Sequence, residues 1–384
     1  MENRRSVKRP GNPFSQRNKM KLAASILRIA LSLGCPALAL GAVPALAGAL
    51  PTNQVAASKT GREEAFKLLD QYAATRNQLK TFIITSKGSE KLDAHYTAGL
   101  DTRLSGVRTL EHLEKFRFDG ARYKIIQQEW GPLPLWNYQQ NNPLYSFRLW
   151  DGTNGCIYQD DPRRGPGTPD PNGSRYSLQF YGYNKAPHND FIMGASKVGY
   201  LLGYFPNSMP RIDLAFRQAS AISVRAKPEL VDGSPCLVVD AATKSGRGSI
   251  WLDPQHGYLI AKAEFHIRAG DLDAINRAQK PGRVTDLKIQ GIRFAKLNDT
   301  WVTVAGTLET RSTWPPDGYE NAVYTDEITE IIPNPDFSTL PNAFGLEDVH
   351  DGARVQLDGR RGYFVWRNGQ VQPAPSPPSG RRGR

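Results

Sequence analysis

The sequence is poor in the residues that build metal sites and disulfide scaffolds. Its 384 residues include three cysteines, six histidines and four methionines. Three cysteines exclude a small disulfide-rich scaffold. The histidines are scattered, and no two stand at the i, i+4 spacing that places both imidazoles on one helix face. We therefore expect no metal site and no cofactor.

The motifs of nucleotide and nucleophilic chemistry are also missing. The chain has neither a Walker A sequence nor a Rossmann glycine fingerprint. Lys244-Ser245-Gly246 resembles one box of the serine β-lactamases, but no serine has a lysine three residues later, so the matching nucleophile motif is absent. We expect a protein that is not an enzyme. Paired carboxylates, which meet only in three dimensions, are the catalytic arrangement that the sequence leaves open.

Little net charge is left once the N-terminus is set apart. The formal net charge is +12, but eight of the 49 basic and one of the 37 acidic residues lie in 1–47, which leaves 41 basic and 36 acidic residues and a net charge of +5. Arg381, Arg382 and Arg384 contribute three of those five charges. The body of the protein therefore lacks the electrostatic footprint of a nucleic-acid-binding protein, and we expect no nucleic-acid partner.

Residues 1–47 have the pattern of a secretory signal peptide. A basic start precedes an apolar run that ends in Ala45-Leu46-Ala47, a small-residue cleavage pattern. Arg28 and Pro36 interrupt the run, and the stretch after Arg28 is short for a membrane-spanning anchor. We expect a periplasmic or otherwise exported protein, cleaved near Ala47 and at most peripheral to a membrane.

The three cysteines leave one question open. Cys35 lies inside the expected signal peptide and would carry a lipid only if the signal peptidase accepted Ser32 where leucine is usual, so we expect cleavage near Ala47 instead. Cys156 and Cys236 stay in the mature chain. An oxidising compartment allows them to pair, but both lie in strand-like contexts where cysteine also serves as a small buried hydrophobe.

The rest of the sequence predicts a helix followed by many strands. We expect residues 48–58 to form a linker, 59–372 a single β-rich domain, and 373–384 a disordered tail rich in proline and arginine. Apolar residues recur at helical spacing over 65–73, which predicts a helix of about four turns. From residue 80 onward, β-branched and aromatic runs alternate with turn sequences such as Asp151-Gly152, a strong hairpin signal.

Residues 248–267 predict a hairpin within a large antiparallel sheet. Two β-rich runs flank 253–257, where a proline presets one turn dihedral and a glycine can supply a positive φ. The second run has the period-two pattern of a strand with one buried side. The residues on its apolar face are Leu259, Ala261, Ala263, Phe265 and Ile267.

A helical pattern interrupts the strands at 191–205. Pro206 ends the pattern, and an amphipathic helix inserted among strands must lie across a face or rim of the sheet. We expect the aromatic strand faces to curve around a cavity that this helix closes as a lid, although an ordinary core explains the same aromatics. The expected ligand-binding residues are Phe116, Phe118, Tyr145, Phe147, Leu149, Leu178, Phe180, Val198, Leu201, Leu202, Phe205, Leu259 and Phe265.

Three stretches resemble the LolA/LolB-like periplasmic lipoprotein-carrier superfamily, especially its long members described as outer-membrane lipoprotein-sorting proteins. They are Trp251-Leu252-Asp253-Pro254 with Gly257-Tyr258-Leu259, the closing segment 337–355, and the helix from Thr60 leading into Phe82-Ile83-Ile84. The resemblance implies an incomplete barrel, plugged by helices, that carries acyl chains or senses lipoproteins. The chain is longer than a simple carrier, and none of its residues matches the carrier's lid-latching arginine.

The expected fold is therefore mainly β (α+β), a strongly curved antiparallel sheet or incomplete β-barrel with an N-terminal helix and an inserted lid helix. The expected function is that of an exported carrier holding a lipid or a lipoprotein acyl chain in an apolar cavity. The alternative is an envelope sensor or protein-interaction module of the same fold, without catalysis. Such a module would keep an exposed apolar patch away from any cavity for an envelope protein partner.

Overall fold

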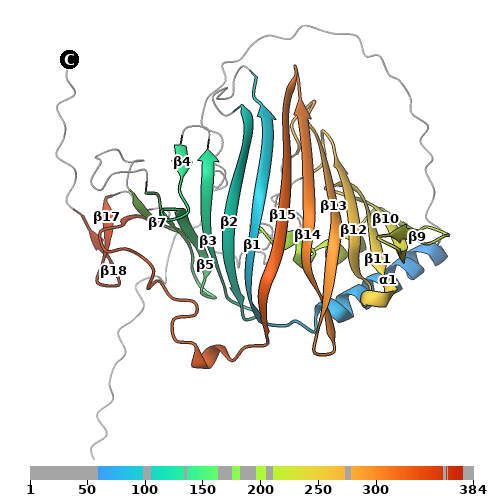
Figure 1. Ribbon diagram of the computed structural model, residues 1–384, viewed down its shortest axis with the longest axis horizontal. Helices are drawn as coiled ribbons and strands as arrows, with labels where there is room; N and C mark the ends of the chain where they lie inside the picture. The colour runs from blue at the N-terminus through green and yellow to red at the C-terminus, as the bar shows by residue number, and fades with distance from the viewer. Residues whose placement is uncertain are drawn as a thin grey trace, which may run out of the picture. The chain divides into compact units, whose positions relative to one another are not determined.

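The fold is built on one large sheet. The computed structural model describes residues 59–97, 105–133, 136–162, 175–181, 196–204, 211–272, 278–357, 360 and 362–374. Within these ranges it has 18 strands in one sheet and two α-helices, α1 (Lys59–Arg76) and α3 (Ile212–Arg217) (Figure 1). The sheet is curved and unclosed, so the prediction of a mainly β fold with an open curved sheet and an N-terminal helix is confirmed.

The strands follow one another across the sheet in an almost wholly antiparallel order. In chain order they are β1 (Phe82–His95), β2 (Gly106–Phe118), β3 (Tyr123–Leu133), β4 (Trp136–Tyr138), β5 (Leu144–Trp150), β6 (Gly155–Asp160), β7 (Tyr176–Tyr181), β8 (Ala221–Val224), β9 (Glu229–Val231), β10 (Ser234–Thr243), β11 (Gly246–Asp253), β12 (Leu259–Ile267), β13 (Val284–Leu297), β14 (Thr300–Trp314), β15 (Gly318–Pro333), β16 (Arg354–Leu357), β17 (Phe364–Arg367) and β18 (Gln370–Pro373). Their order in space is β18-β17-β16-β7-β6-β5-β3-β2-β1-β15-β14-β13-β12-β11-β10, with β4 beside β3 and with β8 and β9 beside β10. Only β7 and β16 run parallel among these pairs.

The predicted hairpin is present, but a bulge places one residue of its second strand on the opposite face of the sheet from the one predicted. β11 and β12 flank a 3₁₀ turn, η3 (Pro254–His256), in which the Asp253 side chain accepts from the Gln255 amide and Gly257 takes φ 66°. A bulge beside Leu252 shifts the register. Ala261 therefore packs in a small cluster with Trp251, away from the main core that holds the rest of the predicted apolar face.

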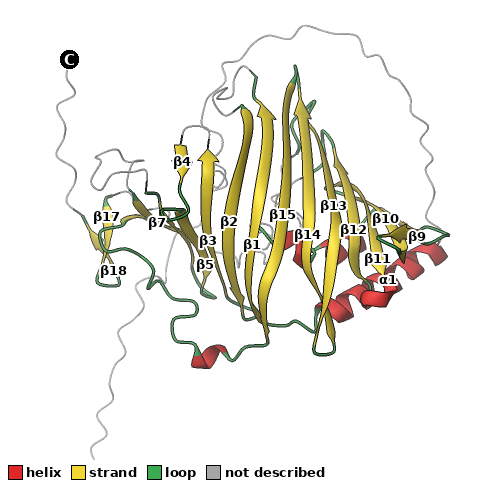
Figure 2. Cartoon of the chain, viewed as in Figure 1, coloured by secondary structure: helices red, strands yellow, loops and turns green. Residues whose placement is uncertain are grey.

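One face of the sheet, here called the inner face, is covered by α1, α3 and residues 196–204. In Figure 2 α1 lies across the β10–β12 end of the sheet. Ala65 and Leu69 of α1 are fully buried against strand residues such as Ile84 and Phe265, because the apolar stripe predicted from helical spacing faces the sheet. These contacts form the main core.

The predicted lid helix over 191–205 is wrong for the part that the structure describes. Residues 196–204 contain turns and one 3₁₀ turn, η2 (Gly199–Leu202), and no α-helix. Gly203 ends the turn at φ 83°, and a Cβ at this position would collide with the Tyr72 hydroxyl of α1. This close approach to α1 requires a glycine in the left-handed region, which ends the short turn in spite of the helical spacing of the sequence. The remaining positions, 191–195 and Phe205, lie outside the described residues.

The opposite, outer face carries a second core at the β5–β7 end. Residues 336–353 lie over it and contribute Val349 and Ala353 to a cluster with Phe147, Tyr158 and other strand residues. Lys124 of β3 holds this segment. Its side chain is 0% exposed, and its ammonium donates to the Gly345 carbonyl at 2.9 Å, to Asp348 at 2.7 Å and to Glu347 at 3.3 Å.

The two cysteines of the described chain are free. Cys156 lies in the outer core and Cys236 in the small cluster beside Trp251. Burial raises the pKa of the Cys156 thiol to about 12 and that of Cys236 to about 11, so both are neutral at physiological pH. The pairing that the sequence left open is not formed.

Several boundary predictions fall outside the described residues. The signal peptide 1–47, the linker 48–58 and tail residues 375–384 all do so. Pro373, which was expected to begin the tail, ends strand β18 instead. No helix in the described part of the chain combines the length and apolar character needed to cross a membrane.

Lys124→Ala should lower the free energy of unfolding by about 2 kcal/mol or more, because it removes hydrogen bonds from a charged donor to three acceptors in a buried position. Denaturant unfolding measures this loss. The matched control is Lys87→Ala, whose side chain is 59% exposed beside Glu327 and should cost less than about 1 kcal/mol. Equal losses in the two variants would contradict the anchoring role of Lys124.

Candidate functional site

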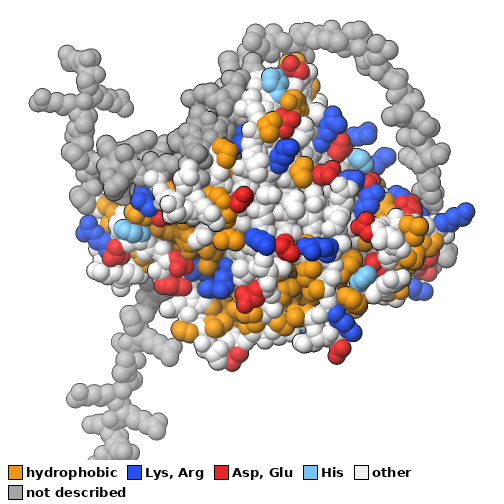
Figure 3. All heavy atoms as spheres, viewed as in Figure 1, with side chains coloured by type: hydrophobic (Ala, Val, Ile, Leu, Met, Phe, Trp, Pro, Cys, Tyr) orange, Lys and Arg blue, Asp and Glu red, His pale blue; other side chains and the backbone are white. Residues whose placement is uncertain are grey.

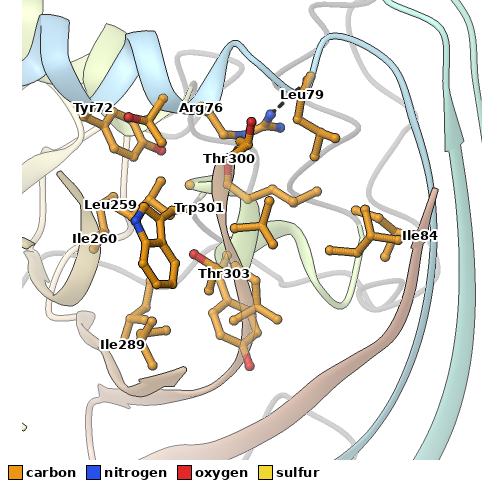
Figure 4. A pocket seen from close by; sticks show the side chains of 18 residues that line it. Tyr72, Arg76, Leu79, Ile84, Leu259, Ile260, Ile289, Thr300, Trp301 and Thr303 are labelled. Atoms are coloured by element: carbon orange, nitrogen blue, oxygen red, sulfur yellow. Dashed lines mark hydrogen bonds between the residues drawn. The ribbon is translucent and has the colours of Figure 1, made fainter. Parts of the chain in front are cut away.

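The main hollow on the inner face lies between α1, η2 and strands β12–β15. We call it the inner cavity. Figure 4 shows the Trp301 indole beside Leu259 and Ile260, with Ile289 next to it and Ile84 across the hollow. Its free volume is about 30 Å³, which is room for one or two water molecules and not for an acyl chain. Leu201 and Leu202 of η2 form part of its wall.

Arg76 is the one charged residue among the described residues that line the inner cavity. Its guanidinium donates to the carbonyl of Leu202 at 3.2 Å and to that of Leu79 at 3.3 Å. It also lies 5.9 Å from the centre of the Phe82 ring. The guanidinium thus ties the end of α1 to η2, and one of its two acceptors belongs to the segment that closes the cavity.

A buried polar cluster adjoins the cavity at the centre of the inner face. Strand β1 runs between β2 and β15, and Gly88 stands opposite both His112 and Asp326. The His112 Nε2 and Asp326 Oδ1 atoms meet over this glycine at 2.6 Å, with both side chains almost fully buried. A Cβ at Gly88 would collide with Asp326 and stand 2.7 Å from His112 Nε2, so only glycine leaves room for the pair.

Two glutamates of the cluster bind the start of residues 196–204, here called the covering segment. Glu114 accepts from the Ser196 hydroxyl, from the Lys197 amide at 2.9 Å and from the Gln127 side chain at 2.7 Å. Burial raises the pKa of Glu114 in spite of these hydrogen bonds. Glu129 differs, because the Lys197 ammonium outweighs the effect of burial and lowers the pKa of that carboxyl.

The Lys197 side chain is the cation of the cluster. Its ammonium lies 3.1 Å from a carboxylate oxygen of Glu90 and 3.1 Å from one of Glu129. It also lies 5.8 Å from the centre of the Tyr324 ring. Burial by itself would lower the pKa of Lys197, but the two carboxylates raise it, so the ammonium stays charged.

Three polar atoms in the cluster have no hydrogen-bond partner among the described residues. They are His112 Nδ1, Asp326 Oδ2 and Ser86 Oγ, all buried. Ser86 stands opposite Glu114 in the register, one row from the His112–Asp326 pair. Buried polar atoms without partners are uncommon in folded proteins and often mark functional sites.

The structure divides the predicted ligand-binding residues between two faces. In the main core on the inner face are Phe116, Phe118, Val198, Leu201, Leu202, Leu259 and Phe265, of which Leu201, Leu202 and Leu259 line the inner cavity. In the outer core are Tyr145, Phe147, Leu149, Leu178 and Phe180. Phe205 lies outside the described residues. One cavity lined by all of them is therefore not formed.

The strand register explains this division. Phe116 stands opposite Ile125, whereas Phe147 stands opposite Ile126, so the two aromatics point to opposite faces. Alternation within each strand was visible in the sequence. The phase of one strand against the next was not, because a shift of one residue exchanges the faces.

The outer core borders a larger hollow of about 540 Å³, here called the outer groove. Leu149, Phe180 and Trp366 line it together with Glu347 and Asp351. These two acidic side chains and that of Asp151, which also lines the groove, already have partners. Glu347 accepts from Lys124, Asp351 from the Asn368 amide, and Asp151 from the Thr153 and Asn154 amides. The groove has the volume of a small-molecule site, but none of the described residues that line it has a buried polar group without a partner to orient a ligand.

The polar cluster was missed in the sequence, although a signal for it exists. His112 and Glu114 stand four and two residues before Phe116, so they share its inward-facing side of β2. Titratable residues on the buried side of a strand lower the stability of the fold unless they are paired, because burial removes their hydration. Their partners come from β15 and from the covering segment, which the sequence does not place beside β2.

Comparisons of the sequence with known protein families and with curated proteins return no match. The resemblance to lipoprotein carriers therefore stays a prediction. In the part of the chain that the structure describes, no three histidine, cysteine, aspartate or glutamate side chains come together to hold a metal ion.

Glu114 and Glu129 should affect stability in opposite ways as pH changes. The raised pKa of Glu114 means that the folded protein favours its neutral form, so its contribution is lost as pH rises above the usual value of 4.5. The free energy of unfolding of the wild type minus that of Glu114→Gln should fall over this range, by at most about 1.4 kcal/mol per pH unit. For Glu129→Gln, the same difference should instead fall as pH drops below 4.5. Denaturant unfolding across pH measures both, and parallel curves would contradict the assignment.

Proposed function

We propose that this is an exported binding protein that holds an apolar ligand, a lipid or an acyl chain, on the inner face of its sheet. The observation that carries the proposal is the construction of the inner cavity. Its walls are mainly apolar, and the segment that closes it has no α-helix and no place in the sheet's strand ladder. The resemblance to lipoprotein carriers implies the same kind of ligand.

The closed cavity requires the covering segment to move before a ligand enters. Val198, Tyr200, Leu201 and Leu202 are all buried, and exposing them would cost roughly 2 kcal/mol each, about 8 kcal/mol together. An acyl chain recovers about 0.8 kcal/mol for each buried methylene, so about ten methylenes offset that cost. A long alkyl chain can therefore replace the segment, whereas a short apolar molecule cannot.

The backbone attachments of the covering segment are few. Outside its own turns, its backbone contacts among the described residues are the Ile212 amide donating to the Gly203 carbonyl at 3.0 Å and a bridge between Tyr204 and Arg211. The other attachments are made by side chains, chiefly those of Ser196 and Lys197. An element held mainly by side chains can leave the sheet without breaking a strand ladder.

The surface gives less support to the alternative of a protein-interaction module. On the outer face of β1, β2 and β15, the exposed Leu113 stands opposite Lys87 and the exposed Val323 stands opposite Lys91. Figure 3 shows acidic and basic side chains close together across the central strands, in keeping with the ion pairs that Glu327 makes with Lys87 and Arg293. Hydrophobic residues beside this charged row are interrupted by charge, whereas Figure 3 shows hydrophobic side chains gathered below the row on the same face.

A disulfide that locks the covering segment tests the proposal. A Cβ at Gly306 would lie 3.0 Å from the Cδ2 atom of Leu201, which makes Leu201→Cys and Gly306→Cys a candidate pair, and the same Cβ would displace the end of the Ile292 side chain, 2.5 Å away. The oxidised double variant should lose binding of a fluorescent fatty-acyl probe, and reduction should restore it. Each single variant under the same oxidant is the control, which also accounts for the two native thiols. Full probe binding by the cross-linked protein, or no probe binding by the wild type, would overturn the proposal.

A further inference from the structure

The polar cluster contains a site built for an ammonium group. Two carboxylates, of Glu90 and Glu129, each lie 3.1 Å from the Lys197 ammonium, and the Tyr324 ring centre lies 5.8 Å from it. Paired carboxylates with an aromatic face are the usual means of holding a primary or quaternary ammonium. In this structure the site is filled by a side chain of the covering segment itself.

The covering segment has the chemistry of an amphiphile. Lys197 supplies a cation, and Leu201 and Leu202, four and five residues later, supply apolar groups that line the inner cavity. Tyr200 lies between Lys197 and the two leucines in the sequence. It lines the cavity, and its hydroxyl donates to the Gly306 carbonyl of β14 at 2.7 Å. If the segment leaves to admit a ligand, its cation and its apolar groups leave together.

The sheet that the segment would uncover is acidic. Its inward polar groups include the carboxyls of Glu90, Glu114, Glu129 and Asp326. The basic groups that act on them from the sheet are His112 and, beside Glu129, Arg148. Asp326 Oδ2 already lacks a partner among the described residues. A neutral or anionic amphiphile would bury further carboxylates without a partner, which is costly.

We propose that the apolar ligand of this protein carries an ammonium group, which takes the place of the Lys197 ammonium between Glu90 and Glu129 while the alkyl chain takes the place of Leu201 and Leu202. This inference rests on the proposed function and names its ligand class, a cationic amphiphile. The competing head group is an anion at Arg76, because displacement of the segment would also free that guanidinium from the Leu202 carbonyl. The choice between them is an outcome of the test.

Three probes with the same alkyl chain, dodecylammonium, dodecanoate and dodecanol, can be titrated into the full exported chain by calorimetry below their micellar concentrations. Dodecylammonium should bind at least about tenfold more tightly than dodecanol, a difference of about 1.4 kcal/mol. In the Glu90→Gln/Glu129→Gln variant the ratio of these two affinities should fall close to one. Tighter binding of dodecanoate, or an unchanged ratio in the variant, would overturn the ammonium site and leave the apolar-ligand function standing. If no probe binds to the wild type, the proposed function itself fails.

Chemical rescue provides a second readout. Lys197→Met removes the ammonium and keeps an apolar stem, so its melting temperature should fall, and dodecylammonium should raise it again more than dodecanol does. Lys87→Met, at an exposed lysine on the outer face, is the control and should show no such difference between the probes. A Lys197→Met protein that responds equally to both probes would contradict the proposal. If that variant does not fold, the affinity ratio in the glutamine variant decides the matter.

Discussion

An open antiparallel sheet exposes two faces to water, and the need to cover both of them governs the rest of this structure. The strands are long, and their buried phases are rich in large apolar residues such as Phe116 and Phe147. No closure of the sheet hides those residues. Short elements therefore do so, with α1 and the covering segment on the inner face and residues 336–353 on the outer face.

The two covers are attached in different ways. The outer segment is held through Lys124, a buried cation whose partners lie on that segment, and by a compact apolar cluster. The inner segment is also held by an ammonium, that of Lys197, but there the carboxylates lie on the sheet. Burial of an ion pair is close to neutral in net free energy, because desolvation offsets the attraction. The ion pair thus fixes the position of the inner segment, while its buried apolar residues supply the roughly 8 kcal/mol that a ligand must offset.

Much of the fold could be predicted from the sequence, because it depends on local patterns. The apolar stripe of α1 and the hairpin around Pro254 and Gly257 follow from spacing and turn chemistry. The bulge that turns Ala261 to the other face could not be predicted, since it depends on how β12 pairs with β11. Helical spacing over 191–205 was misleading at 199–203, where the approach of Gly203 to Tyr72 decides the conformation.

The candidate site could be predicted only in part, for a similar reason. Leu201, Leu202 and Leu259 line the inner cavity. Their burial could be predicted, because the spacing of apolar residues along a segment is a local pattern. The polar cluster joins residues more than a hundred positions apart, such as His112 with Asp326 and Lys197 with Glu90. These pairs depend on β1 lying between β2 and β15 and on the covering segment folding back over them, and no local pattern encodes either arrangement.

In the function proposed above, residues 196–204 form a plug that a ligand displaces. Amide hydrogen exchange, followed by mass spectrometry with and without a saturating long-chain amphiphile, tests it most directly, because exchange reports the opening of each segment separately. A displaced plug should show faster exchange in peptides spanning 196–204 on ligand binding, with the β11–β12 hairpin unchanged as an internal reference. Slower or unchanged exchange in 196–204 at saturation would show that the segment stays in place and is not displaced by the ligand.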